Sequence, residues 1–70
     1  HDGFESSLAE EISRLPEREK MVMALYYEQS LSMKEIGLVM GVSESRVCQL
    51  HSQAVSRLRK TLNEWATEAT

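Results

Sequence analysis

Four basic residues in the second half of the chain are the first candidates for chemistry: Arg46, Arg57, Arg59 and Lys60, with no acidic residue between the first and the last. Guanidinium and ammonium groups bind phosphate oxygens, so this segment is a candidate for binding a polyanion. Its surroundings have the opposite sign, because residues 1–45 hold nine acids and four bases and the 70-residue chain has a formal charge of −3. A polyanion responds to charge within a Debye length of ~8 Å, so a local basic surface can still bind it. The alternative is an ordinary solvated helix face.

Neutral hydrogen-bonding side chains share a helical face with these bases. Projection at about 100° per residue separates an apolar stripe from a polar stripe. The polar stripe consists of Ser45, Gln49, Ser52, Gln53, Ser56 and Lys60, with Arg46, Arg57 and Arg59 at its edges. Glutamine can pair with adenine N6 and N7, and serine can bond to several base edges. The stripe predicts a helix that lies in the major groove of DNA, and the alternative is a polar surface helix.

A helix-turn-helix over about 33–62 is predicted to position this stripe. Glycines at two positions would allow close helix approach and a sharp turn, and apolar residues between them and beyond would pack in the interior. The residues at the required offsets are Ile36, Gly37, Gly41, Val42, Val47 and Leu50. The apolar stripe of the second helix, expected to face the core, comprises Val47, Leu50, Ala54, Leu58 and Trp65.

Capping signals predict where these two helices begin and end. Ser32 and Glu35 have capping-box spacing, which predicts the start of a short helix. Gly41 can take the left-handed conformation that ends it. Ser43 can then cap a long helix that runs from residue 44 to beyond residue 62.

Two further helices are predicted earlier in the chain. Ser7 and Glu10 also have capping-box spacing, so a first helix is expected over about 8–14. Pro16 favours the first position of a second helix, which should run to residue 28 or 29. We expect residues 66–70 to fray. The predicted fold of residues 1–70 is therefore one small all-α domain of four helices that contains the helix-turn-helix.

Composition argues against several functional classes. Cys48 is the one cysteine, expected to be a small packing residue, so no internal disulfide or metal site is predicted and no cofactor is expected. The sequence has no membrane-length apolar run and no signal peptide, so we expect a cytoplasmic protein without a membrane partner. No nucleophile, base and orienting group have informative spacing, so neither an enzyme nor a small-molecule substrate is expected. The chain begins with His1 rather than Met, so we expect it to be a piece of a longer protein.

The run MVMALYY, residues 21–27, is a candidate protein-binding surface. Seven consecutive apolar residues cover every side of a helix, which is more than one modest core buries, so part of the run should stay exposed. The candidates for partner binding are Met21, Met23, Tyr26 and Tyr27. The four methionines are otherwise expected in the core, and His51 is expected at the boundary of the buried stripe.

From Leu15 to Leu62 the sequence resembles region four, the C-terminal domain, of bacterial sigma factors of the sigma-seventy family. The phrases LPERE, YY and ESRVCQLHSQAVSRLR most resemble the flagellar, or motility, class. This resemblance implies binding to the minus-thirty-five promoter element and docking on the β flap of RNA polymerase. It also implies control by an anti-sigma protein that contacts this domain.

The same resemblance assigns the base-facing positions to Glu44, Ser45 and Gln49, with Arg46 and Gln53 nearby. Housekeeping sigma factors commonly have an arginine at the position of Glu44 and a glutamate at the position of Ser45. Without that arginine the usual guanine contact is missing, which favours a promoter element rich in A·T pairs.

Two other functions remain open on the sequence alone. The output domain of a response regulator also favours KEI before the turn and VSES after it, although LPERE, YY and RLR favour a sigma factor. A domain that serves chiefly to bind a regulator through MVMALYY, with its DNA helix idle, is the other alternative.

Overall fold

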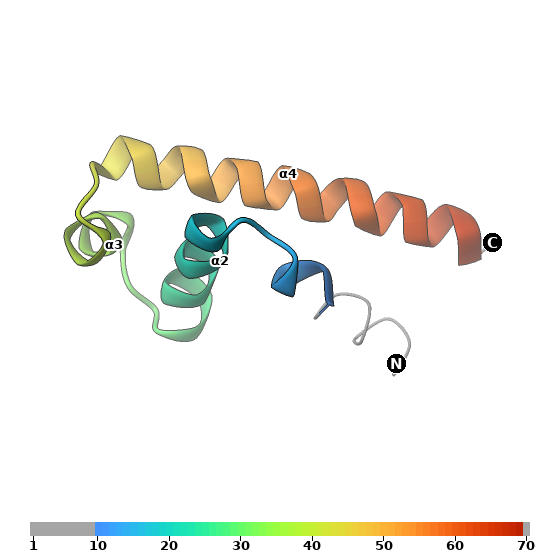
Figure 1. Ribbon diagram of the computed structural model, residues 1–70, viewed down its shortest axis with the longest axis horizontal. Coiled ribbons are helices and arrows are strands. Elements are labelled where there is room, and N and C mark those ends of the chain that lie inside the picture. The colour runs from blue at the N-terminus through green and yellow to red at the C-terminus, as the bar shows by residue number, and fades with distance from the viewer. Residues whose placement is uncertain (1–9, 70) are drawn as a thin grey trace.

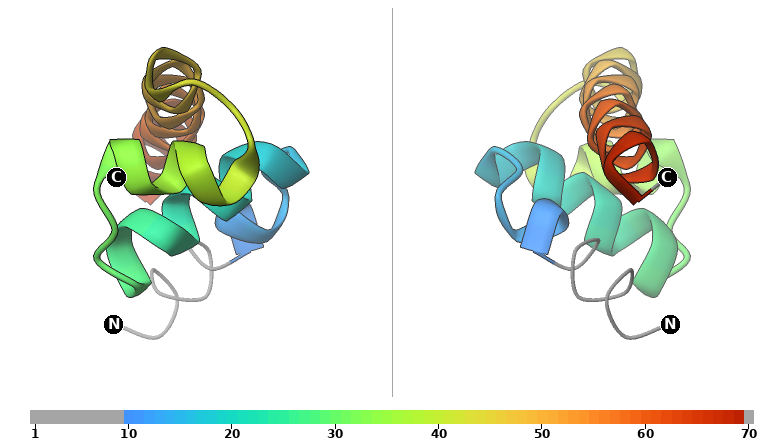
Figure 2. Two further views of the ribbon diagram at one scale, coloured as in Figure 1. Left: turned by 90° about the vertical axis from the view of Figure 1, so that its left-hand side faces the viewer. Right: turned by 90° about the vertical axis from the view of Figure 1, so that its right-hand side faces the viewer.

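The computed structural model describes the backbone of residues 10–69 and the side chains of residues 10–64. A helical turn at residues 10–13 precedes α2 (Glu17–Met23), the π-helix η1 (Ala24–Glu28), α3 (Met33–Met40) and α4 (Glu44–Ala69). In Figure 1, α4 runs the length of the molecule, with α2 and α3 beneath its first half. Figure 2, which looks along α4, shows α3 crossing it at a steep angle. The predicted all-α fold with a helix-turn-helix is confirmed.

The capping box at the start of α3 is formed as predicted. The Ser32 hydroxyl accepts from the Glu35 backbone N–H at 3.1 Å, and the Glu35 carboxylate accepts from the Ser32 backbone N–H at 2.8 Å. The backbone N–H of Ser32, and then its side chain, hold the pKa of Glu35 below its ordinary value. The carboxylate therefore stays ionised and keeps accepting this bond at neutral pH.

The turn between α3 and α4 depends on two glycines. Gly41 has φ +72°, the left-handed conformation, and ends α3 as predicted. Gly37 is buried, and a Cβ atom there would lie only 2.7 Å from the carbonyl oxygen of Val42. The close approach predicted at Gly37 is thus an approach to the backbone of the turn itself. Ser43 then caps α4, since its hydroxyl accepts from the Arg46 backbone N–H at 3.1 Å.

The core lies where α2, α3 and the first half of α4 meet. Its central cluster is Val22, Ile36, Val47 and Leu50. Half-buried hydrophobic residues surround the cluster, among them Met33, Met40 and Val42. Of the predicted apolar stripe on α4, Val47, Leu50 and Ala54 are buried and Leu58 is half-buried, whereas the side chain of Trp65 lies outside the described part.

The second helix differs from the prediction at its first residue and in the geometry of its last turn. Pro16 is the residue before the helix, with ψ 147°, rather than its first helical residue. The predicted end near residue 28 or 29 is right, but the last turn is π-helical and the Gln29 N–H donates to the carbonyl oxygen of Ala24 at 3.3 Å. Ser30 then takes a left-handed φ of 58°, which reverses the chain toward α3. Tertiary packing of the tyrosines in this turn accompanies the π geometry, and helical periodicity alone does not encode it.

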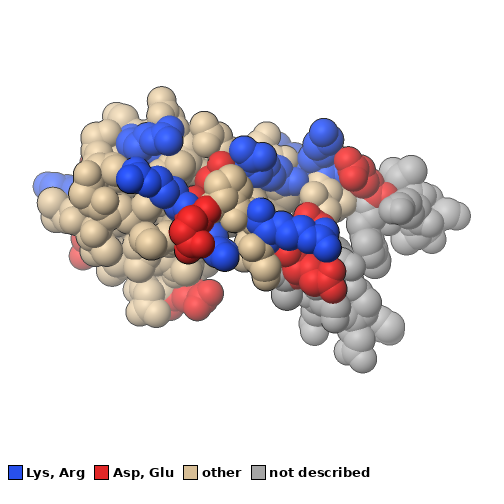
Figure 3. All heavy atoms as spheres, in the orientation of Figure 1, with Lys and Arg blue, Asp and Glu red and all other residues tan. Residues whose placement is uncertain are grey.

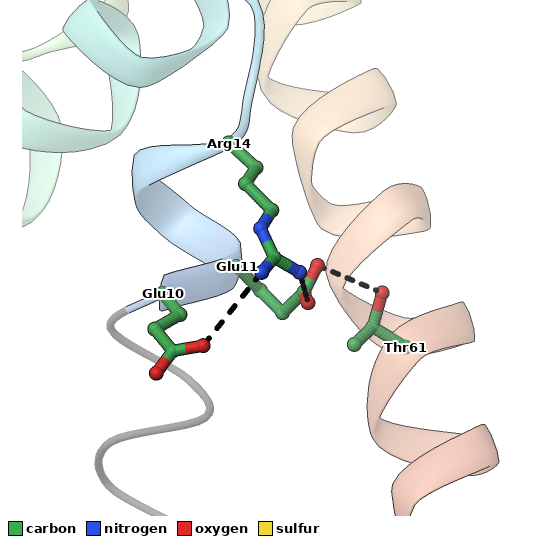
Figure 4. A network of polar contacts seen from close by, with 4 residues as sticks. All are labelled: Glu10, Glu11, Arg14 and Thr61. Carbon is green, nitrogen blue, oxygen red and sulfur yellow. Dashed lines mark hydrogen bonds and ion pairs between the residues drawn. The ribbon is translucent and has the colours of Figure 1, made fainter.

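The helical turn at residues 10–13 lies beside the second half of α4 (Figure 1). Figure 4 shows the contact: Thr61 on α4 donates to Glu11 at 3.5 Å, and Arg14 bonds to Glu11 at 2.9 Å and faces Glu10 at 3.7 Å. The start of the first helix predicted at residue 8 lies outside the described residues. The helix α4 is described through Ala69, and the expected fraying of residues 66–70 stays a prediction.

Gly37→Ala should destabilise the domain. Alanine favours a helix over glycine by about 1 kcal/mol, but a methyl group forced against a backbone carbonyl costs typically ~1–3 kcal/mol. Because the contact would be as short as 2.7 Å, we expect a net loss of about 1–2 kcal/mol in the free energy of unfolding, measured by urea denaturation. Leu38→Ala, at a neighbouring side chain that is 77% exposed, is the control and should change little. A Gly37→Ala variant as stable as the parent would contradict the close contact.

Candidate nucleic-acid interface

The polar face of α4 is the largest set of predicted site residues, and it is exposed. All six of its side chains are exposed: Ser45, Gln49, Ser52, Gln53, Ser56 and Lys60. Since the buried stripe of α4 packs on α2 and α3, the polar face points away from the body of the domain. The groups on it are hydroxyls, amides and one ammonium, which can meet base edges without burying a carboxylate.

Arg46 and Gln49 form a pair within this face. The Arg46 Nη1 donates to the Gln49 Oε1 at 3.3 Å, so the guanidinium holds the amide in one orientation. The amide oxygen keeps a second lone pair and the amide nitrogen keeps its two donors. Gln49 can therefore still make both hydrogen bonds that an adenine edge requires. Glu44, one turn earlier, is exposed in the first turn of α4.

Arg57 is directed away from the polar face and toward α2. Its Nε donates to both carboxylate oxygens of Glu19, at 3.0 and 3.3 Å. Glu19 is a buried carboxylate, with a side chain only 3% exposed, whereas the Arg57 side chain is 58% exposed. A buried charge is costly without a partner, so this ion pair has a structural role. The sequence predicted that the positive charge of Arg57 contacts DNA. That charge is instead largely compensated by Glu19 within the domain.

The distribution of charge over the surface follows the same division. In Figure 3 several Lys and Arg side chains lie along the top of the molecule, where α4 runs, while Lys, Arg, Asp and Glu side chains are intermixed below it. The sequence predicted this contrast from the run between positions 46 and 60. A polyanion that approaches the polar face of α4 meets neutral groups flanked by basic ones, with Glu44 in the first turn of the helix.

An aromatic cluster joins η1 to α4. The hydroxyl of Tyr27 and the Nε2 of His51 are 2.9 Å apart, and their rings stack with centroids at 5.8 Å. Tyr26 packs edge-on against both rings. His51 is half-buried, as expected of a boundary residue. Cys48 was expected to pack but is exposed, because it lies about 100° around α4 from Val47, outside the narrow buried stripe.

Part of MVMALYY is exposed, as predicted. Met21, Tyr26 and Tyr27 are 41%, 36% and 59% exposed, whereas Val22 is fully buried. The expectation that all four methionines belong to the core is thus wrong for Met21. Met23 is half-buried.

An apolar hollow lies beside this exposed surface. Its volume is about 480 Å³, and its apolar walls come from residues 12–13, α2, η1 and α4, chiefly Ile12, Met23, Ala24, Tyr27 and Leu58. Lys20 and Glu28 also line it and give it charges of both signs. The sequence pointed to Met23 and Tyr27 but not to Ile12 or Leu58, because these come from elements that only the tertiary fold brings together.

The partner of Arg57 was also missed, although the sequence carries a signal for it. Leu15, Glu19 and Val22 are spaced four and three residues apart, which places the carboxylate on the buried side of α2. An acid on that side requires a cation from a neighbouring helix.

No helix in the described part is long and apolar enough to cross a membrane, and no cluster of His, Cys, Asp or Glu there could hold a metal ion.

Comparison with known proteins identifies the family. The profile described as "Sigma-70, region 4" matches residues 12–60. RNA polymerase sigma factor FliA of Pseudomonas aeruginosa is 60% identical over 64 residues, which is 91% of this chain and 26% of that protein. FliA of Escherichia coli K12 is 60% identical over 55 residues, 79% of this chain and 23% of that protein. RNA polymerase sigma-D factor of Bacillus subtilis is 40% identical over 63 residues, which is 90% of this chain and 25% of that protein.

The chain therefore spans about a quarter of the length of these relatives. No solved structure gives a significant match. The profile covers the helix-turn-helix and the polar face of α4 together, and it covers well over half of the sequence. This chain belongs to the sigma-70 region 4 family.

Proposed function

We propose that this domain binds promoter DNA sequence-specifically, at the minus-thirty-five element, as the C-terminal domain of a flagellar-class RNA polymerase sigma factor. The observation that carries the proposal is the exposed, nearly uncharged polar face of α4 directly after a helix-turn-helix turn. Similarity to FliA and sigma-D supports the flagellar class. The domain acts by binding and performs no chemistry, and a protein that works with RNA polymerase does so in the cytoplasm.

The proposed DNA contacts divide into two groups. Ser45 and Gln49 meet base edges, because a recognition helix inserts its N-terminal part into the major groove. Glu44, Arg46, Ser52 and Gln53 lie beside them. Lys60, about three turns beyond Gln49, is placed for the phosphate backbone.

Arg57 is withdrawn from the principal phosphate contacts, because its Nε is occupied by Glu19 at 3.0 Å. The Arg57 side chain is 58% exposed, so its terminal nitrogens can make only a secondary contact with a phosphate. The remaining base-facing set lacks the arginine that would read guanine at position 44, so we propose an A·T-rich element.

The second proposed partner is the β flap of the RNA polymerase core, bound at the apolar hollow between α2, η1 and α4. A hollow of about 480 Å³ with largely apolar walls, next to exposed Met21, Tyr26 and Tyr27, suits the apolar side chains of a partner helix. Lys20 and Glu28 would fix its direction. An anti-sigma protein that covers the same surface would block the sigma factor from polymerase.

Gln49→Ala should weaken binding to the preferred element by about 1–3 kcal/mol and leave almost unchanged the binding to an element altered at the pair that Gln49 reads. The measurement is fluorescence anisotropy of holoenzyme on duplexes with single-pair changes. Lys60→Ala is the contrast: it should weaken all duplexes alike and reduce the salt slope by about one unit, as expected for a phosphate contact. Equal losses for Gln49→Ala on every duplex would place Gln49 on the backbone.

Met23→Glu should weaken binding of the intact sigma factor to core polymerase, because a carboxylate would be desolvated in the apolar hollow. Tyr27→Glu, at a side chain that is 59% exposed, is a second variant with less risk to folding. Leu38→Glu adds the same charge on α3, outside the hollow, and should bind as the parent does. Circular dichroism establishes that each variant is helical. Folded Met23→Glu and Tyr27→Glu proteins with parental affinity would exclude the hollow as the docking site.

A further inference from the structure

A second hollow lies along the edge of the polar face of α4, on the side of the aromatic cluster. This groove has a volume of about 300 Å³ and is lined by His51, Ser52, Val55, Ser56 and Arg59. Four of these five side chains can hydrogen-bond, and two of them, Ser52 and Ser56, also belong to the polar face. The groove is thus continuous with the surface proposed to meet DNA.

The groove contains an arginine whose charge is not compensated. Among the residues whose side chains are described, Arg59 makes no ion pair, whereas Arg57 is bound to Glu19 at 3.0 Å. The two arginines are two residues apart, so they project about 200° apart around α4, toward opposite edges of the polar face. Among the residues whose side chains are described, the edge with the groove therefore offers a guanidinium without an ion pair at this level of the helix.

The donors in the groove follow one line along α4. Ser52, Ser56 and Arg59 are spaced four and three residues apart, which puts them on successive turns of one side of the helix. At 1.5 Å per residue they span roughly 10 Å. Two hydroxyls and a guanidinium over this length can each donate a hydrogen bond to a phosphate oxygen.

All five lining residues belong to α4, and one of them, His51, is held in place by η1. The His51 ring is stacked on Tyr27 and its Nε2 is hydrogen-bonded to the Tyr27 hydroxyl at 2.9 Å, while Tyr26 packs edge-on at 5.3 Å. The ring is therefore fixed before any ligand binds, which lowers the entropic cost of forming a contact. No carboxylate is among the described residues that line the groove.

We propose that this groove holds a backbone phosphate of the bound DNA, with Arg59 as the main contact and Ser52 and Ser56 as further donors. The proposal rests on the proposed promoter-binding function and adds a site to it. When the first turns of α4 lie in the major groove, side chains two to three turns later lie near the phosphates at its wall. Because Arg57, on the other edge, is compensated by Glu19, the contact at Arg59 adds to the one proposed for Lys60 and helps to fix how α4 is rotated over the bases.

The test removes the charge from one partner at a time. Duplexes of the promoter element that carry a single methylphosphonate, a neutral linkage, at successive positions are titrated with holoenzyme. Parent protein should lose about tenfold in affinity at one or two linkages, as expected for a charged hydrogen bond. Arg59→Gln should be weaker by a similar factor on the unmodified duplex and show no further loss at those linkages.

Arg18→Gln is the matched control, because it removes the same charge from an exposed residue of α2, away from the groove. It should keep the full sensitivity to the neutral linkages. If Arg59→Gln, verified as helical, stays as sensitive as the parent at every linkage while the parent still prefers promoter over scrambled duplex, the groove proposal is overturned and the promoter function stands. If the parent shows no such preference, both fall.

Discussion

The contact between Gly37 and the Val42 carbonyl is the constraint on which the rest of this domain depends. The absence of a side chain at Gly37 and the left-handed φ of Gly41 let the chain turn between α3 and α4 in three residues. That turn fixes the direction in which α4 leaves α3, and Ile36 and Val47 lock the crossing in the core. The direction of α4 in turn decides where its polar face projects. The proposed recognition of DNA therefore depends on the close contact between Gly37 and the Val42 carbonyl, which lies away from the polar face.

Beyond this crossing, α4 is held by polar contacts rather than by a large core. A domain of this size buries few side chains completely, and the central cluster has only four members. Farther along α4, the buried Glu19 fixes Arg57, and Glu11 accepts from Thr61 at 3.5 Å (Figure 4). The Glu19–Arg57 pair also makes the two edges of the helix electrostatically unequal. One interaction thereby stabilises the fold and shapes the charge that a nucleic acid meets.

Features that depend on neighbours in sequence were predicted well. The capping box at Ser32 and the left-handed Gly41 are local chemistry, and the exposure of the polar face follows from helical spacing. Features that depend on distant partners were not. The π-turn in η1 and the pairing of Arg57 with Glu19 arise from how α2 and η1 pack on α4. The sequence thus predicted the exposed polar face of α4 but not the pairing of Arg57 with Glu19.

The most direct test of the account is a change of specificity. Holoenzymes with Gln49 or with Gln49→Arg are used to select from a pool of duplexes randomised over the minus-thirty-five element. Arginine reads guanine as glutamine reads adenine, so the selected sequences should change from A·T to G·C at one position, and the other positions should stay the same. Circular dichroism shows whether the variant keeps the helical fold. An unchanged selected sequence would contradict the claim that the polar face of α4 reads bases.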